Sequence, residues 1–366
     1  MTNEGPIGLT LSTRQINRAV LARQHLLSRA ELDIPTTLQH VGCLQTQYAP
    51  SGYIGLWSRL VDFERDSLTR ALEDRSVVQA TLMRCTIHMT SADDFWPIGA
   101  AIRISRREWW QRIAKSRKMT DISHEALADV LRAELTDGPR SAAELIAAIE
   151  RAGFTKPSWE GAGLWLDMVR APPSGTWERR RADRFCLAEQ WVPPTGVVSE
   201  DDGIRLLLTR YFGAFGPAAL GDAATWSGVP RARLAPVAAA MALVTYRDEG
   251  GATLHDLADA PLPDAATPSP VRFLPTWDAT LLAHCRRSGI LPEAFRQAIF
   301  HTKNPQSVGT VLVDGAVAAT WAWRVDHVEV DELGNLTRSQ RREVAGEADR
   351  LTVFSRDDHR PRASRA

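Results

Sequence analysis

The sequence predicts a mainly α-helical protein with small β elements, an α+β class made of tandem winged helix-turn-helix units and a C-terminal antiparallel β-sheet or barrel element. Apolar residues recur at helical spacing in three successive segments, and each segment closes with a short β-rich run. The last part of the chain carries a strong hairpin signal instead. A chain of 366 residues is long enough for roughly two to three domain-sized units.

The first unit is expected over residues 9–135. Ser12 and Gln15 form a capping box, which predicts a helix over residues 13–28. Two shorter helices and a β-rich run are expected after it, at residues 35–44, 53–60 and 77–89. Three helices followed by strands is the order of a winged helix-turn-helix unit, in which the third helix can enter a DNA groove.

A long basic helix is expected to end this unit. Ser91 is a candidate N-cap, and the helical pattern continues through Lys118. Residues 101–120 hold seven basic residues against one acidic residue, a net charge of +6. Such a run either follows a phosphate backbone or forms a solvated helix face, and the sequence leaves both interpretations open. The candidate DNA contacts on this helix are Arg103, Arg106, Arg107, Lys115, Arg117 and Lys118.

A second unit is expected over residues 136–198 and a third over residues 199–250. The second begins at a capping box, Ser141 with Glu144, and its helices are expected at 142–151 and 159–170. A two-strand wing should follow, with candidate DNA contacts at its basic tip: Arg179, Arg180 and Arg181. The third unit repeats the scheme, with helices at 201–214, 218–226 and 231–243 and a strand at 244–247.

The C-terminal β element is expected over residues 265–355, after a Pro/Ala/Asp-rich linker at 251–270. Within it, Asp314-Gly315 separates two β runs, which is a strong signal for a tight hairpin. We expect this hairpin to project from the sheet. The polar residues 357–366 are expected to fray.

The composition and motifs of the chain exclude several classes of binding site and enzyme. Net charge is zero, so local basic patches matter more than the total. The four cysteines form no CxxC pair and the nine histidines show no metal-binding spacing, so neither a metal nor another cofactor is expected. Phosphate-loop and GxSxG hydrolase motifs are also absent. Without a membrane-spanning apolar run or a secretory N-terminus, the sequence predicts a cytoplasmic protein with no membrane partner, and nothing in it demands more than a monomer.

Two glutamines, Gln45 and Gln47, are the most informative polar residues. On a continuous α-helix their side chains would point about 200° apart, whereas an extended or turning chain lets both amides face one substrate. Pro50 disfavours helix at Ala49, and the apolar helical stripe stops at Leu44. The chain should therefore leave the helix here. The plain alternative is a solvated helix end.

His88 lies within a predicted strand. Alternation places it on the face opposite Ile87 and Met89. A half-buried structural histidine is the ordinary interpretation, and a contact with DNA is the alternative.

The chain resembles the AlkZ/YcaQ superfamily of winged-helix bacterial DNA glycosylases from about residue 9 to about residue 325. The matching pieces, in order, are LQTQYAP with GLWSRL, MRCTIHMTSADDFW, LPTWDATLLAH and VLVDGAVAATW. The resemblance implies tandem winged-helix units, a C-terminal β element, duplex DNA as partner and a Gln-x-Gln catalytic motif. It therefore implies catalytic roles for Gln45 and Gln47. It also implies that a projecting hairpin contacts DNA, which we assign to Val313, Asp314, Gly315 and Ala316.

The resemblance implies a base-excision repair enzyme that removes bulky or crosslinked N7-alkylated purines, often for self-resistance to a DNA-alkylating antibiotic. The chemistry agrees, because glutamine supplies neither an acid nor a charge. The leaving base must then already be cationic, as an N7-alkylguanine is. No lysine adjoins the motif, which favours a monofunctional glycosylase. The alternative is a non-catalytic winged-helix DNA-binding protein, either a regulator or one that sequesters adducts.

Overall fold

The computed structural model describes residues 9–117, 119, 123–285, 288–300 and 308–356. Its α-helices are α1 (Thr13–Arg23), α2 (Ile34–Val41), α3 (Pro50–Arg59), α4 (Arg65–Glu73), α5 (Ala92–Ser116), α6 (His124–Leu135), α7 (Ala142–Arg151), α8 (Trp159–Ala162), α9 (Ala188–Trp191), α10 (Glu200–Phe215), α11 (Leu220–Ser227), α12 (Arg231–Ala239), α13 (Arg296–Ile299) and α14 (Arg338–Arg356). The short 3₁₀ helices are η1 (Met83–Cys85), η2 (Lys156–Ser158), η3 (Ala279–Leu281) and η4 (Glu293–Phe295).

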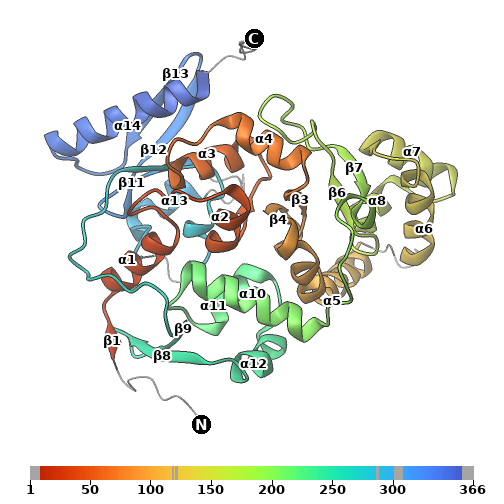
Figure 1. Cartoon of the computed structure of the whole chain (residues 1–366), viewed down its shortest axis with the longest axis horizontal. Coiled ribbons are helices and arrows are strands. Elements are labelled where there is room, and N and C mark those ends of the chain that lie inside the picture. Colours follow the sequence, from red (N-terminus) through yellow and green to blue (C-terminus); the bar gives the residue numbers. More distant parts are fainter. Residues whose placement is uncertain (1–8, 118, 120–122, 286–287, 301–307, 357–366) are drawn as a thin grey trace.

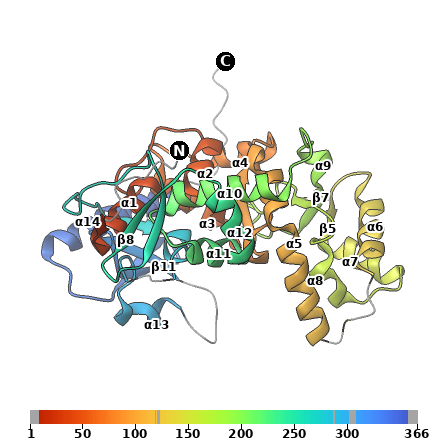
Figure 2. The ribbon, with the colours of Figure 1, turned by 90° about the horizontal axis from the view of Figure 1, so that it is seen from below.

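The strands of the described residues form three sheets. They are β1 (Thr10–Leu11), β2 (Leu44–Gln45), β3 (Val77–Thr81), β4 (Ile87–Ser91), β5 (Arg140–Ser141), β6 (Met168–Arg170), β7 (Arg184–Leu187), β8 (Leu243–Asp248), β9 (Thr253–Leu257), β10 (Arg272–Leu274), β11 (Gly309–Val313), β12 (Ala316–Arg324) and β13 (His327–Glu332). The predicted α+β class is confirmed. The molecule is elongated, with α14 and the C-terminal sheet at one end and α6, α7 and α8 at the other (Figures 1 and 2).

A six-stranded sheet joins the first two predicted units. Its strand order is β2-β4-β3-β6-β7-β5, and the junction is the antiparallel pair Ala80–Val169 between β3 and β6. The two wings therefore form one continuous surface. This matters for the site, because it fixes the β6–β7 loop of the second unit beside the first unit (Figure 1).

The third unit packs on the first through helices. α10 lies along α5, and Arg210 of α10 makes a bidentate ion pair with Asp94 of α5, with N–O distances of 2.7 and 2.9 Å. Asp94 is almost fully buried, so this pair fixes the two helices at their contact. β8 and β9 form a small sheet with β1, which runs parallel to β8.

The C-terminal element is the antiparallel sheet β10-β11-β12-β13, covered on one side by α14. The predicted β element is confirmed, but α14 was not predicted. Among the described residues, no helix is both long enough and apolar enough to cross a bilayer. Residues 357–366, which were expected to fray, lie outside the described residues.

Several predicted elements differ from the structure. The helix expected at 159–170 ends at Ala162, and Met168–Arg170 forms β6 instead. Gly161 and Gly163 have low helix propensity, which favours an early helix end. Residues 168–170 then form a strand because they pair with β3 and β7. The expected linker at 251–270 contains strand β9. The run at 77–89 is a hairpin of β3 and β4 around η1.

Candidate functional site

The two glutamines lie where the chain leaves a helix, as the motif requires. α2 ends at Val41, and two successive left-handed residues, Gly42 (φ 70°) and Cys43 (φ 72°), turn the chain into β2. Glycine adopts this conformation without strain, so it is the usual residue after a helix end. β2 then pairs with β4, and Gln45 lies directly across from His88.

Both amides rest against the segment 84–88. The Oε1 atom of Gln45 accepts a hydrogen bond from Nη2 of Arg84 at 2.9 Å, and Oε1 of Gln47 accepts one from the backbone N–H of Ile87 at 3.2 Å. Guanidinium and backbone N–H groups only donate, so these contacts set which end of each amide is the oxygen. The NH₂ group and the second oxygen lone pair of each amide remain for other partners. Gln45 is mostly buried and Gln47 is exposed.

Arg84 is a site residue that the sequence analysis missed. Besides Gln45, its guanidinium binds the backbone carbonyl of Trp226 at the end of α11. Its backbone is left-handed (φ 52°), a conformation that costs about 1 kcal/mol for a residue with a side chain. Desolvation lowers its pKa to about 10, so it stays charged at neutral pH. An arginine inside a predicted strand gave no sequence signal for this contact.

His88 is buried on the same sheet face as Gln45. Burial, and then the charge of Arg84, lower its pKa to about 3, so the ring is neutral at physiological pH. Its Nδ1 lies 3.0 Å from the carbonyl oxygen of Thr86, which makes Nδ1 the protonated nitrogen. The neutral ring therefore brings no positive charge to a phosphate, and its Nε2 can only accept a hydrogen bond.

The basic run on α5 turns largely toward the second unit. Arg103 forms an ion pair with Asp167 at 2.9 Å. Arg106 is only 6% exposed and donates to the carbonyl of Thr81 at 2.6 Å. Arg107 donates to the carbonyl oxygen of residue 164 at 2.8 Å. Three of the predicted phosphate contacts thus have partners inside the protein.

The remaining residues of this run are placed differently. Arg117 forms a half-exposed ion pair with Glu160 at 2.5 Å. Lys115 is exposed on the surface of α5. Lys118 lies outside the described residues. Lys115 and Arg117 therefore stay accessible to a ligand on that face.

The three arginines of the wing lie on the exposed tip of the loop 171–183 between β6 and β7. Nη1 of Arg180 donates to the hydroxyl of Tyr48 at 2.9 Å. Arg181 pairs with Asp183 at 3.1 Å, and Arg179 is exposed. The structure thus brings Arg180 next to the glutamine pair, which no sequence pattern indicated.

The turn Val313–Ala316 does not project, contrary to the sequence-based expectation. Asp314 (φ 48°) and Gly315 (φ 80°) do form the predicted tight turn. However, Asp314 forms ion pairs with Arg14 at 2.9 Å and Arg18 at 2.5 Å, which dock the turn on α1. The Asp-Gly sequence predicts the tight turn, but it does not show that the carboxylate of Asp314 binds two arginines of a distant helix.

A neighbouring hairpin extends instead. Among the described residues, residues 322–324 of β12 pair only with β13, past the first residue of β11. At its tip Val325 is 98% exposed and Trp323 is 41% exposed. Both apolar side chains are thus open to a partner at this end of the hairpin.

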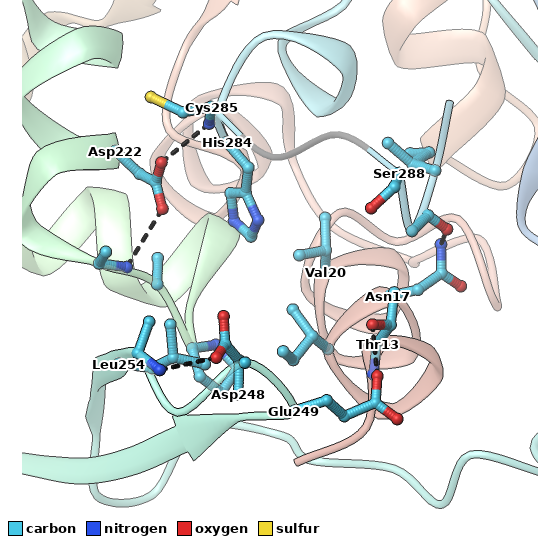
Figure 3. A pocket seen from close by; sticks show the side chains of 18 of the residues that line it. Thr13, Asn17, Val20, Asp222, Asp248, Glu249, Leu254, His284, Cys285 and Ser288 are labelled. Atoms are coloured by element: carbon cyan, nitrogen blue, oxygen red, sulfur yellow. Dashed lines mark hydrogen bonds between the residues drawn. The ribbon is translucent and has the colours of Figure 1, made fainter. Parts of the chain in front are cut away.

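A separate cavity of about 370 Å³ lies between α1, the start of α11, the β8–β9 turn and residues 284–285 and 288–290 (Figure 3). Asp222 accepts from the backbone N–H groups of Ala219 at 3.2 Å and Cys285 at 2.8 Å. None of the predicted site residues lines this cavity. Within the described ranges, no group of three or more His, Cys, Asp or Glu residues could hold a metal ion.

The family model described as "DNA glycosylase AlkZ-like" matches residues 38–354. The chain belongs to this AlkZ-like family. Among solved structures, Streptomyces sahachiroi DNA glycosylase AlkZ is similar to it, with a TM-score of 0.80 and 18% sequence identity over 95% of this chain and 97% of that chain. At this identity the likeness shows the fold. A search of curated proteins gave no match.

Membership confirms the resemblance seen in the sequence. It supports a DNA glycosylase with DNA as its partner. The matched range includes Gln45, Gln47 and Arg84, so the site described above lies within the part of the chain that defines the family.

Proposed function

We propose that this AlkZ-like protein is a monofunctional DNA glycosylase that hydrolyses the N-glycosidic bond of cationic N7-alkylated purines in duplex DNA, with Gln45 and Gln47 as its catalytic residues. The observation that carries the proposal is that the chain has left helix α2 before Gln45, and that both side-chain amides accept hydrogen bonds from segment 84–88. The neutral side chains of Gln45 and Gln47 can then act together on one sugar and its leaving base.

The chemistry follows from what the amides can and cannot do. Ordinary glycoside hydrolysis needs a proton donor for the leaving group and a carboxylate for the sugar cation or the water. Within the described residues, the side-chain hydrogen bonds of Gln45 and Gln47 go to Arg84 and Ile87, not to a carboxylate. A neutral purine would have no acid to help it leave. An N7-alkylpurine carries its own charge and needs none.

The free atoms of the amides suit the remaining tasks. The second lone pair of either Oε1 can orient the attacking water or face the positive sugar, and the NH₂ groups can bind oxygen atoms of the substrate. The exposed Gln47 suits the water, because solvent reaches it. Gln45, whose Oε1 is held by Arg84, suits a fixed contact with the nucleotide.

DNA contact is proposed for the exposed basic residues Lys115, Arg179, Arg180 and Arg181 and for the extended tip of the β12–β13 hairpin. Exposed cations favour phosphates, while the apolar tip at Trp323 and Val325 suits a groove or a base step. Arg106 is excluded from this set by its burial.

The test compares base release from four duplexes that are otherwise identical: N7-methylguanine, a bulky N7-guanine adduct, a neutral hypoxanthine and undamaged guanine. Release from the two cationic lesions alone, leaving an abasic site without strand cleavage, is the expected result. Efficient release of hypoxanthine would contradict the charge requirement. Tight binding to the lesions without any release would favour the non-catalytic DNA-binding alternative.

We also propose that the protein acts as a monomer and protects its host against a DNA-alkylating natural product, acting on crosslinks as well as on single adducts. Support comes from the Gln-x-Gln motif, which resembles that of the AlkZ branch. Deletion of the gene should then sensitise the host to bulky alkylating agents more than to methylating agents. Equal sensitivity of the deleted and parent strains to both classes would contradict this role.

A further inference from the structure

The two residues that alternate with the glutamines are held by a different part of the protein. Gln45 and Gln47 contact segment 84–88, whereas Thr46 and Tyr48 are bound by a buried side chain and by the loop 171–183. The motif is thus held on two sides, and the second side comes largely from the second unit.

Thr46 is fixed by a buried polar pair. Its hydroxyl accepts a hydrogen bond from Nε2 of Gln79 on β3 at 3.0 Å, and both side chains are at most 2% exposed. Its backbone N–H donates to the carbonyl of Ile87 at 2.8 Å. On the other side its methyl group lies against Gly52, where an added Cβ would come within 3.0 Å of it. A buried polar pair is costly to break, so it holds Thr46 in one place.

The loop presses on the other end of Gln79. A Cβ added at Gly175 would lie 2.2 Å from Oε1 of Gln79 and 3.1 Å from Cβ of Ala182. Only glycine allows this approach, and the φ of +79° also favours glycine. The amide of Gln79 is therefore confined between the loop backbone and the hydroxyl of Thr46.

The loop reaches the motif a second time through Arg180. Its guanidinium donates to the hydroxyl of Tyr48 at 2.9 Å and lies 5.9 Å from the ring of Tyr48 and 5.8 Å from that of Trp177. Stacking and a hydrogen bond together limit where the tyrosine can lie.

The loop is anchored, so it can hold a position. Trp177 is only 8% exposed, and its ring lies 5.7 Å from that of Tyr53 in α3 and 5.7 Å from that of Phe354 in α14. Arg65 of α4 stacks on it at 5.0 Å. Aromatic contacts of this kind stabilise a structure beyond the simple burial of their surface. The loop of the second unit is thus tied to three elements of other units.

We propose that the loop 171–183 is part of the glycosylase site, and that Gln79 and Arg180 are positioning residues that set the orientation of Gln45 and Gln47 through Thr46 and Tyr48. This proposal rests on the glycosylase function proposed above. Neither residue need touch the reacting atoms. Each holds a neighbour of a catalytic amide, so its loss acts on the geometry of the bond-breaking step.

The first experiment is a double-mutant cycle on the buried pair: Thr46→Val, Gln79→Met and the double variant, assayed by single-turnover release of N7-methylguanine. Each single change leaves one buried polar group unpaired and should lower the maximal rate about tenfold with little change in the half-saturating protein concentration. The double variant has no unpaired group and should recover to within about threefold of wild type. The proposal would be overturned if the loss of rate in the double variant equalled the product of the two single losses, or if neither single change altered the rate.

The second experiment compares Tyr48→Phe with Arg180→Ala. Both remove the same hydrogen bond, so both should lower the maximal rate by about threefold to tenfold, and the double variant should fall no further than Arg180→Ala. Arg151→Ala is the matched control, because Arg151 is an exposed arginine of the same unit that pairs with Glu134 at 3.2 Å. A rate for Tyr48→Phe equal to that of wild type would remove Arg180 from the proposal.

A readout without catalysis separates this proposal from the proposed function. Hydrogen exchange of the backbone N–H at position 46 should be faster in Thr46→Val and in Gln79→Met than in wild type and the double variant. If wild type releases no base but this exchange pattern holds, the glycosylase proposal fails and the positioning contact stands. If wild type releases base and exchange is equal in all four proteins, the positioning proposal fails alone.

Discussion

Arginines in two regions of the molecule hold different parts of it in place. On α5, Arg106 and Arg107 donate to the backbone carbonyls of residues 81 and 164, and Arg103 pairs with Asp167. At the motif, Arg84 and Arg180 donate to side chains, the amide of Gln45 and the hydroxyl of Tyr48. The α5 contacts join elements of the fold, whereas Gln45 belongs to the proposed catalytic pair and Tyr48 follows it directly. Arg84 also reaches the carbonyl of Trp226, so it ties the motif to α11. The comparison therefore separates arginines that hold the fold from arginines that hold the site.

The largest effect in this comparison is expected at Arg84. Arg84→Ala should lower the single-turnover rate by about 30- to 100-fold, because Gln45 loses the donor that orients its amide. Arg84→Lys should recover little of the rate, since lysine keeps the charge but cannot bridge the amide and the carbonyl of Trp226 in the same geometry. Full activity of the lysine variant would show that charge, not orientation, is what Arg84 supplies.

The same truncation at Arg106 should act on stability. Arg106→Ala leaves the carbonyl of Thr81 without this donor and opens a gap between α5 and the end of β3. We expect the free energy of unfolding to fall by about 2 kcal/mol, as measured by urea denaturation. The salt dependence of DNA binding should not change. A flatter salt dependence would instead place Arg106 on a phosphate and break the comparison.

How far the sequence predicted these regions depends on the range of the interactions. The capping box at Ser12, the basic helix from Ser91 and the departure from helix before Gln45 are local and were predicted correctly. The inward turn of Arg106 and the docking of Asp314 on α1 depend on residues far away in the chain, which no local pattern reveals. Arg84 was missed for the same reason, since its partners lie 39 and 142 positions away.

A smaller effect is expected from the exposed loop cations. Arg179→Ala and Arg181→Ala should each weaken binding to any duplex a few-fold and reduce the slope of log K against log salt by about 1, if each neutralises one phosphate. Lys115→Ala tests the exposed face of α5 in the same way. An unchanged salt slope in all three variants would move the DNA path away from both basic regions.

The smallest effect is expected from pH. Glutamines do not titrate, burial lowers the pKa of His88 to about 3, and desolvation lowers that of Arg84 to about 10. His88 is therefore neutral and Arg84 charged throughout the middle range, so the maximal single-turnover rate on N7-methylguanine should be flat between about pH 5 and pH 8. A limb with a midpoint near pH 6 or 7 would reveal a titrating acid or base that the two amides do not provide.

The central claim is that two uncharged amides carry the reaction. Its most direct test is the single-turnover release of N7-methylguanine by wild type, Gln45→Ala, Gln47→Ala and Gln297→Ala, in which the last variant removes an exposed glutamine of α13. Each motif variant should be slower by about 100-fold or more while still binding the duplex, and Gln297→Ala should match wild type. Wild-type rates in both Gln45→Ala and Gln47→Ala would contradict the account.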